Sequence, residues 1–159
     1  MFQYIKTCYW SPPEQDFVMF CCDGSSFGNP GSAGFGFVVR DSNCQVLGAM
    51  SGGIGVATNY LAEYYGIMCA VELDVQWGML KIIIVSYFKF VLTEFAKGRV
   101  PWFMKGGCKN ATRKLNQIKY QHGYRETNFT ADCMTKKVAA LAASVRQIYI
   151  GRPRCLPRV

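Results

Sequence analysis

Apolar and polar positions divide the first half of the chain into short strand-like runs followed by one long helical period. The run 16–24 and the two arms of 34–53 are rich in β-branched and aromatic residues, and the turn-forming sequence RDSNCQ separates those arms. In 58–78, apolar residues recur every three or four positions, with Thr58 or Asn59 as the cap and a glycine as the stop. This pattern predicts three consecutive antiparallel strands and then an amphipathic helix.

The second half of the chain contains shorter elements. Its apolar runs and glycine stops predict a strand, two helices, a strand and a final helix, at 81–88, 90–98, 110–118, 120–126 and 127–148. No internal repeat or low-complexity segment is present. Strands and helices in this mixed order indicate an α/β or α+β domain with a mixed sheet.

The length of 159 residues indicates one domain with a substantial core. We expect a lead-in over 1–15, the domain itself over 16–148 and a basic tail over 149–159. No apolar run approaches the roughly 20 residues that a membrane helix needs, and the first residues lack the apolar segment of a secretory signal. The sequence therefore predicts a nuclear or cytoplasmic protein without membrane association.

The eight cysteines include no C-x-x-C pair and no Cys/His cluster with the spacing of a zinc site. Most of them fall within apolar patterns. We therefore expect reduced thiols without disulfides, as is usual for intracellular proteins, and a monomeric chain.

The net charge of +8 is distributed unevenly. Between residues 97 and 125 the chain has eight Lys or Arg side chains and no acidic one. Such a stretch favours a polyanionic partner, of which nucleic acid is the natural candidate. The alternative is an ordinary solvated basic face.

The acidic residues are informative because the whole chain has only ten of them. Asp23 ends the first predicted strand, Glu63 lies inside the first helix, and Asp132 lies near the start of the last helix. Each could be an ordinary surface carboxylate. If the three converge at one sheet edge, they would instead form a site for divalent metal ions that act in phosphoryl displacement. The glycine-rich GSAGFG is neither a phosphate loop nor a dinucleotide motif, because a strand follows it.

Three motifs in order give the chain a resemblance to the ribonuclease H superfamily, type 1, and most closely to plant domains of retrotransposon-like origin. The stretch 10–52 is similar to the opening of that family, with W-x-P-P, D-G-[AS]-S, G-x-A-G-x-G and R-D. The stretch 57–78 has an acid four residues after T-N, and 122–138 resembles the closing H-x-x-R-E-x-N-x-x-A-D. The resemblance implies an α/β ribonuclease H-like fold, with a five-stranded mixed sheet flanked by helices. It also implies metal-dependent endonucleolytic cleavage of RNA in RNA/DNA hybrids.

The resemblance assigns roles to individual residues. Asp23 would bridge two Mg²⁺ or Mn²⁺ ions, Glu63 would ligate one of them, and Asp132 would complete the other side. His122 would be the mobile histidine that shuttles protons or aids product release. Residues expected to contact the nucleic acid are Gly24, Ser25, Asn59, Asn128, Lys105 and Arg113.

One position departs from the family. After the apolar part of the strand that follows the long helix, the family has a fourth acid, and this chain has Tyr87 there, in VSYFK. A phenol is neutral at pH 7 and is a weak metal ligand. We therefore expect cleavage to be impaired and nucleic-acid binding to outlast it. The alternatives are an inactive pseudo-enzyme that binds RNA/DNA hybrid or double-stranded RNA, and a protein-interaction module on the same fold.

Overall fold

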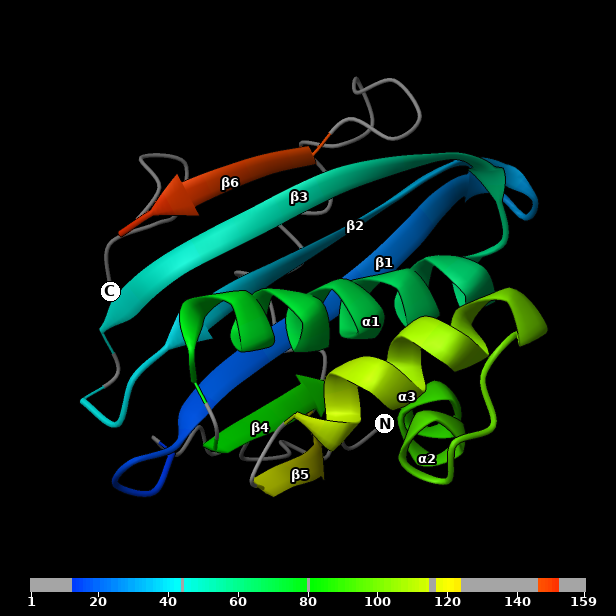
Figure 1. Cartoon of the computed structure of the whole chain (residues 1–159). Helices are drawn as coiled ribbons and strands as arrows, with labels where there is room; N and C mark the ends of the chain where they lie inside the picture. Colours follow the sequence, from blue (N-terminus) through cyan, green and yellow to red (C-terminus); the bar gives the residue numbers. More distant parts are fainter. Residues whose placement is uncertain (1–12, 44, 80, 115–116, 124–145, 152–159) are drawn as a thin grey trace, which may run out of the picture.

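A six-stranded mixed sheet forms the centre of the computed structural model, which describes residues 13–43, 45–79, 81–114, 117–123 and 146–151. The strands lie in the order β5-β4-β1-β2-β3-β6, and α1 and α3 lie side by side across one face of the sheet (Figure 1). The α/β class and the mixed sheet are as the sequence predicts. The number of strands is six instead of the predicted five.

The first three strands form the predicted antiparallel meander. β1 (Val18–Gly28) pairs with β2 (Gly31–Arg40), which pairs with β3 (Val46–Ala57). The turn between β2 and β3 forms at the predicted sequence, because the Asp41 carboxylate accepts the backbone N–H groups of Asn43 and Gln45, each at 2.9 Å. Short polar side chains that bond their own backbone favour such turns.

The predicted long helix is α1 (Asn59–Trp77). Thr58 is the N-cap, since its hydroxyl oxygen accepts the Leu61 N–H at 3.2 Å. Gly78 ends the helix with a φ of 72°, a left-handed conformation that glycine adopts at little cost. Both signals are local in sequence, and the prediction of this helix is confirmed.

Two parallel strands, β4 and β5, continue the sheet beyond β1. β4 (Lys81–Ser86) pairs in parallel with β1 and with β5 (Gln117–His122). The short helix α2 (Lys89–Ala96) follows β4 at once. Because parallel strands end at the same edge, Ser86 and His122 lie opposite each other in the register.

The structure corrects the prediction for the next helix. A 3₁₀ turn, η1 (Trp102–Met104), leads into α3 (Lys105–Arg113), whereas the sequence predicted a helix over 110–118, and Gln117 and Ile118 belong to β5 instead. Two glycines at 106 and 107 lowered the expected helix propensity. A Cβ at Gly107 would lie 2.8 Å from the Met68 terminal methyl, which is the end of a flexible side chain on α1.

A further strand lies beyond the predicted meander. β6 (Arg146–Ile150) pairs antiparallel with β3, so the predicted helix over 127–148 is wrong at its C-terminal end. This pairing also accounts for the sixth strand and crosses the expected boundary between domain and tail. The rest of that predicted helix, with Asn128 and Asp132, lies outside the described residues.

Apolar side chains cover both faces of the central strands. Phe20 and Phe37 face α1, where they pack with residues such as Tyr64 and Ile67. The opposite face of the sheet carries a second buried cluster: Phe17, Met19, Cys21, Ile83 and Val85. Successive residues of β1 therefore point alternately into the apolar clusters on the two faces of the sheet. No helix in the described part of the chain is long and apolar enough to cross a membrane.

Candidate active site

Two of the three predicted acids come together in the described structure. Asp23 lies on β1 opposite Gly36 of β2, and Glu63 lies in the second turn of α1. Both side chains are almost fully buried, with exposed fractions of 1% and 2%. Buried carboxyl groups are rare unless a partner or an ion compensates them, so the pair marks this junction of strand and helix as a candidate site.

Gly24 lies on β1 where the strand contacts α1. Its backbone N–H donates to Glu63 Oε1 at 3.1 Å. A Cβ at this position would lie 2.4 Å from the carbonyl carbon of Ala62, far inside a permissible contact. The structure gives Gly24 a packing role in addition to its predicted contact with nucleic acid, because only glycine lets β1 approach α1 closely enough for this hydrogen bond.

The other oxygen of Glu63 is bound from β4. The Ser86 hydroxyl lies 3.4 Å from Glu63 Oε2 and itself accepts the Phe88 N–H at 3.2 Å. Burial raises the pKa of the Glu63 carboxyl well above its usual range, and the negative charge of Asp23 raises it further. The Gly24 N–H and the Ser86 hydroxyl partly oppose this shift. Glu63 is therefore held in place by donors while it shares a buried space with a second acid.

Tyr87 and His122 meet at the ends of β4 and β5. The His122 Nε2 atom lies 2.9 Å from the backbone carbonyl oxygen of Tyr87. A carbonyl oxygen only accepts hydrogen bonds, so Nε2 must be the donor in this contact. His122 is exposed and Tyr87 is partly buried. The main chain of Tyr87 thus positions the predicted histidine.

The tip of the β1–β2 hairpin fixes the orientation of Asn59. The Ser26 N–H donates to Asn59 Oδ1 at 2.7 Å, and the Asn59 N–H donates to Asn29 Oδ1 at 3.1 Å. Since a backbone N–H can only donate, the Asn59 amide oxygen faces the hairpin and its NH₂ group faces elsewhere. Ser25 is partly buried on the same strand.

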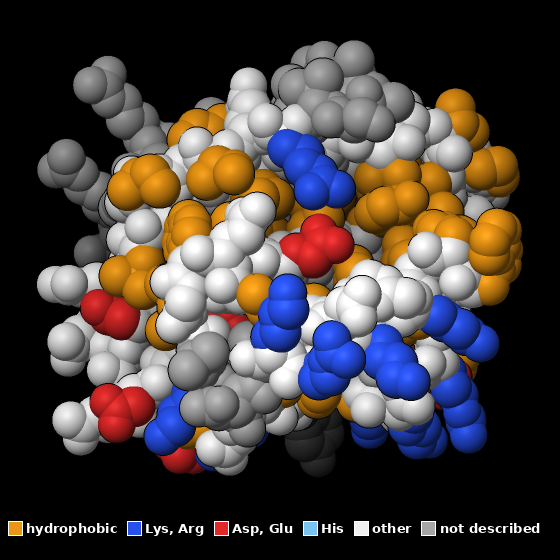
Figure 2. All heavy atoms as spheres, in the orientation of Figure 1, with side chains coloured by type: hydrophobic (Ala, Val, Ile, Leu, Met, Phe, Trp, Pro, Cys, Tyr) orange, Lys and Arg blue, Asp and Glu red, His pale blue; other side chains and the backbone are white. Residues whose placement is uncertain are grey.

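The basic residues of α3 lie on a different surface. Lys105, Lys109 and Arg113 are exposed and follow one another at four-residue intervals, which places them along one side of the helix. Figure 2 shows Lys and Arg side chains gathered over α3 along the lower part of this face. Two other cations of the basic stretch have acidic partners, since Arg99 lies 3.6 Å from Glu94 and Lys119 lies 3.0 Å from Glu14.

Sequence reasoning missed three residues that position the predicted ones: Ser26, Asn29 and Ser86. The first two lie within the DGSSFGNP stretch, and Ser86 directly precedes Tyr87, so adjacency to a candidate acid or cap was the available signal. In the described part of the chain, no group of three or more His, Cys, Asp or Glu side chains could hold a metal ion. The predicted third acid, Asp132, lies outside that part.

The model of the family described as "Reverse transcriptase-like" matches residues 21–138, which include every acid that the sequence analysis placed at the site. The chain belongs to this reverse transcriptase-like family.

Family relatives and solved structures extend the assignment to the ribonuclease H-like superfamily. The bifunctional protein Rv2228c of Mycobacterium tuberculosis is 35% identical over 132 residues, which are 79% of this chain and 36% of that protein. The chain thus spans about a third of the length of this curated relative. The solved N-terminal RNase H domain of Rv2228c superposes with a TM-score of 0.70 at 28% identity, over 77% of this chain and 93% of that one.

A second solved structure shares the fold of this chain. LC11-RNase H1, solved in complex with an RNA/DNA hybrid, matches with a TM-score of 0.64 at 24% identity. The match covers 76% of this chain and 94% of that chain. The ribonuclease H-like fold is therefore established from the sequence family and from the structure.

Proposed function

We propose that this chain is a nucleic-acid-binding ribonuclease H-like domain of type 1 that cleaves the RNA strand of RNA/DNA hybrids weakly and with a divalent cation. The observation that carries the proposal is the buried Asp23–Glu63 pair, at two positions where the sequence motifs of the superfamily place catalytic acids. A hybrid occupies the solved LC11-RNase H1, which has the same fold. The order of the three motifs further supports an origin among plant retrotransposon-like domains.

The acid pair suits a hard divalent cation. Carboxylate oxygens are the ligands that Mg²⁺ and Mn²⁺ prefer, and a cation held by Asp23 and Glu63 would offset the repulsion that raises the Glu63 pKa. A bound cation would polarise a phosphoryl oxygen and lower the pKa of a water molecule. Ligation of a second ion would fall to Asp132 and to the position that Tyr87 occupies.

The surrounding residues of the chain orient these groups. Gly24 and Ser86 donate to the two oxygens of Glu63 and hold its carboxylate toward Asp23. His122 donates from Nε2 to the Tyr87 carbonyl oxygen, so in the neutral imidazole Nδ1 is the nitrogen that accepts a proton. The basic side of α3 supports attraction of a polyanion and favours this proposal over a protein-interaction module.

A second candidate is a domain that binds nucleic acid without cleaving it. Tyr87 favours this alternative, because it removes one carboxylate from the expected ligand set and the sequence has no acidic residue between Asp74 and Glu94. A loss of a few kcal/mol in transition-state stabilisation would lower the rate by orders of magnitude, since each 1.4 kcal/mol corresponds to about tenfold. Binding would then survive without turnover.

Cleavage of an end-labelled RNA/DNA hybrid in Mg²⁺ and in Mn²⁺ separates the two candidates. We expect slow cleavage by the wild type, none by Asp23→Asn, and a rate increase of roughly a hundredfold for Tyr87→Asp, which restores a carboxylate at the ligand position. Tyr87→Asn is the matched control, because it has a similar size to Asp and no charge. Hybrid binding is recorded on the same samples, with double-stranded RNA as a second probe.

The outcomes of this experiment distinguish weak cleavage from binding without cleavage. Binding without wild-type cleavage, and cleavage regained only in Tyr87→Asp, would establish the binding-only domain. Wild-type cleavage unaffected by Asp23→Asn would contradict the proposed acid site. Absence of both binding and cleavage in all variants would overturn both nucleic-acid functions.

A further inference from the structure

Three aromatic side chains form a shelf beside the acid pair, which we call the aromatic shelf: Tyr60, Phe88 and Phe90. The Tyr60 ring centroid lies 5.7 Å from that of Phe90 and 6.5 Å from that of Phe88. Phe90 is 56% exposed and Tyr60 is 39% exposed, whereas Phe88 is partly buried and packs against the core. Large aromatic side chains that contact one another and remain open to solvent mark an interaction surface more often than a core.

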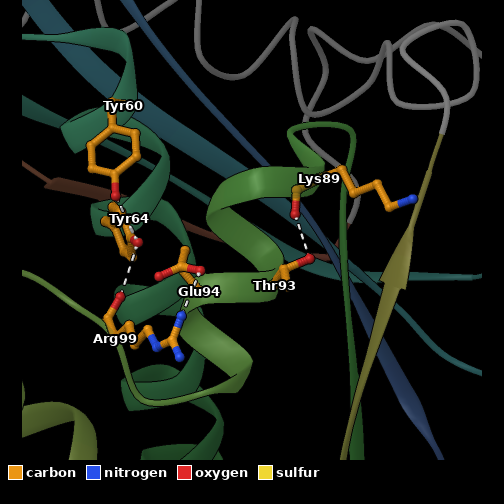
Figure 3. A network of polar contacts seen from close by, with 6 residues as sticks. All are labelled: Tyr60, Tyr64, Lys89, Thr93, Glu94 and Arg99. Carbon is orange, nitrogen blue, oxygen red and sulfur yellow. Dashed lines mark hydrogen bonds and ion pairs between the residues drawn. The ribbon is translucent and has the colours of Figure 1, made fainter.

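Hydrogen bonds hold the shelf in a fixed orientation. The Tyr64 hydroxyl donates to the Arg99 carbonyl oxygen at 3.0 Å, so the Tyr60 hydroxyl must be the donor in its own 3.0 Å contact with the Tyr64 hydroxyl. Figure 3 shows this chain of contacts running from α1 to the segment after α2. Tyr64 is fully buried, which fixes the point to which the Tyr60 ring is anchored. The shelf is therefore preorganised, and a ligand would not have to order it.

The shelf is directly connected to the acid pair. Tyr60 precedes Glu63 by three positions on α1, so the two residues are neighbours on the helix surface. From the other side, the Phe88 N–H donates to the Ser86 hydroxyl, which donates to Glu63. A phosphodiester held at Asp23 and Glu63 would thus bring its neighbouring nucleotides next to the shelf.

The charges around the shelf suit a nucleic acid. Lys89 lies between Phe88 and Phe90 in the sequence and is exposed, and Figure 3 shows its side chain extended from α2 on the side away from Tyr60. The nearby acid Glu94 is paired with Arg99 at 3.6 Å. Exposed aromatic faces are the surfaces on which proteins stack unpaired bases, and a cation on the same helix adds attraction for the backbone phosphates.

We propose that the aromatic shelf stacks unpaired bases of the bound strand beside the acid pair, so that the domain prefers hybrids with a single-stranded extension over blunt hybrids. The inference rests on the proposed function, because it assumes that a nucleic acid lies at Asp23 and Glu63. It deepens that function by naming the substrate class: a hybrid joined to a single-stranded segment. Base-paired nucleotides would gain nothing from the shelf, since their faces are already stacked.

Fluorescence anisotropy with two probes tests this preference. One probe is a blunt RNA/DNA hybrid, and the other carries an extension of about six unpaired nucleotides, within the usual range for a single-strand site. We expect the wild type to bind the extended probe about tenfold more tightly, the size of effect that stacking of a base gives. 2-Aminopurine placed in the extension should lose fluorescence on binding, as a stacked base does.

Substitutions at Phe90 isolate the ring itself. Phe90→Leu should abolish the preference and the 2-aminopurine quenching, whereas Phe90→Tyr should retain both, and binding of the blunt hybrid should stay within about twofold in each. Because Phe90 is more than half exposed, neither change should threaten the fold. The matched control is Ile150→Leu on β6, where an apolar side chain is 82% exposed on the far edge of the sheet.

The outcomes separate this inference from the proposed function. Equal wild-type affinity for the two probes, or an equal loss for both in Phe90→Leu, would overturn the stacking role and leave the proposed function standing. A preference that survives in Phe90→Leu would also overturn it. No affinity for either probe would overturn the shelf and the proposed function together.

Discussion

Glu63 and Asp74 are both buried acids on α1, but their surroundings differ. Glu63 accepts hydrogen bonds from Gly24 and Ser86 and shares its space with Asp23. Asp74 is fully buried, and neither of its carboxyl oxygens has a hydrogen-bond partner within the described structure. Burial raises the pKa of Asp74 to about 7 with no other cause. Burial alone thus shifts a pKa, whereas an organised site also needs donors and a second charged group.

The largest expected effect comes from Asp74. Its folded-state pKa lies above the usual value of 3.8, so the folded protein binds the proton more tightly and stability falls as the pH rises from about 4 through 7. Asp74→Asn should remove this loss and raise the free energy of unfolding at pH 8 by roughly 2–4 kcal/mol. Urea denaturation at pH 5 and pH 8 measures it. A variant that keeps the full pH dependence of the wild type would show that Asp74 has a compensating partner.

The acid pair should respond to divalent cations, and Asp74 should not. Mg²⁺ or Mn²⁺ at saturating concentration is expected to stabilise the wild type by roughly 1–3 kcal/mol at pH 8, because a ligand that binds only the folded state shifts unfolding. Glu63→Gln should lose this stabilisation, and Asp74→Asn should keep it. Thermal unfolding with and without the cation is the measurement. An equal cation response in Glu63→Gln would place the ion elsewhere.

Glu63 and Asp74 should also affect the free energy of unfolding independently. They are eleven positions apart on one helix, or about 16 Å at 1.5 Å per residue, so the effects of Glu63→Gln and Asp74→Asn on stability should add.

The smallest effect concerns the donor that distinguishes the Glu63 site. Ser86→Ala removes the hydroxyl that binds both Glu63 and the Phe88 N–H, and should destabilise the fold by about 1–2 kcal/mol. Ser51→Ala is the matched control, since Ser51 is equally buried and its hydroxyl has no partner in the described part of the chain. Equal losses of stability in the two variants would mean that the Ser86 hydroxyl contributes nothing specific to Glu63.

Local signals were sufficient for the meander and for α1. The Asp41 turn, the Thr58 cap and the Gly78 stop each act within a few residues, so a single sequence shows them. α3 was misplaced because its two glycines argue against a helix locally, while in the fold its buried Cys108 and Ala111 pack against the core. β6 was missed because its partner β3 lies about a hundred positions earlier in the chain, and such pairing leaves no local pattern.

The candidate site likewise has features that the sequence predicted and features that only the structure revealed. The scarcity of acids and the order of motifs singled out Asp23, Glu63 and His122, and the resemblance to the family predicts that Tyr87 stands where a carboxylate is expected. Only the tertiary structure showed that Gly24 is required by the approach of β1 to α1, that Ser86 binds Glu63, and that Tyr87 holds His122 through its carbonyl group. The physical reason is that the sequence gives the type and order of the residues. Burial, charge repulsion and hydrogen bonds arise instead between segments that only folding brings together.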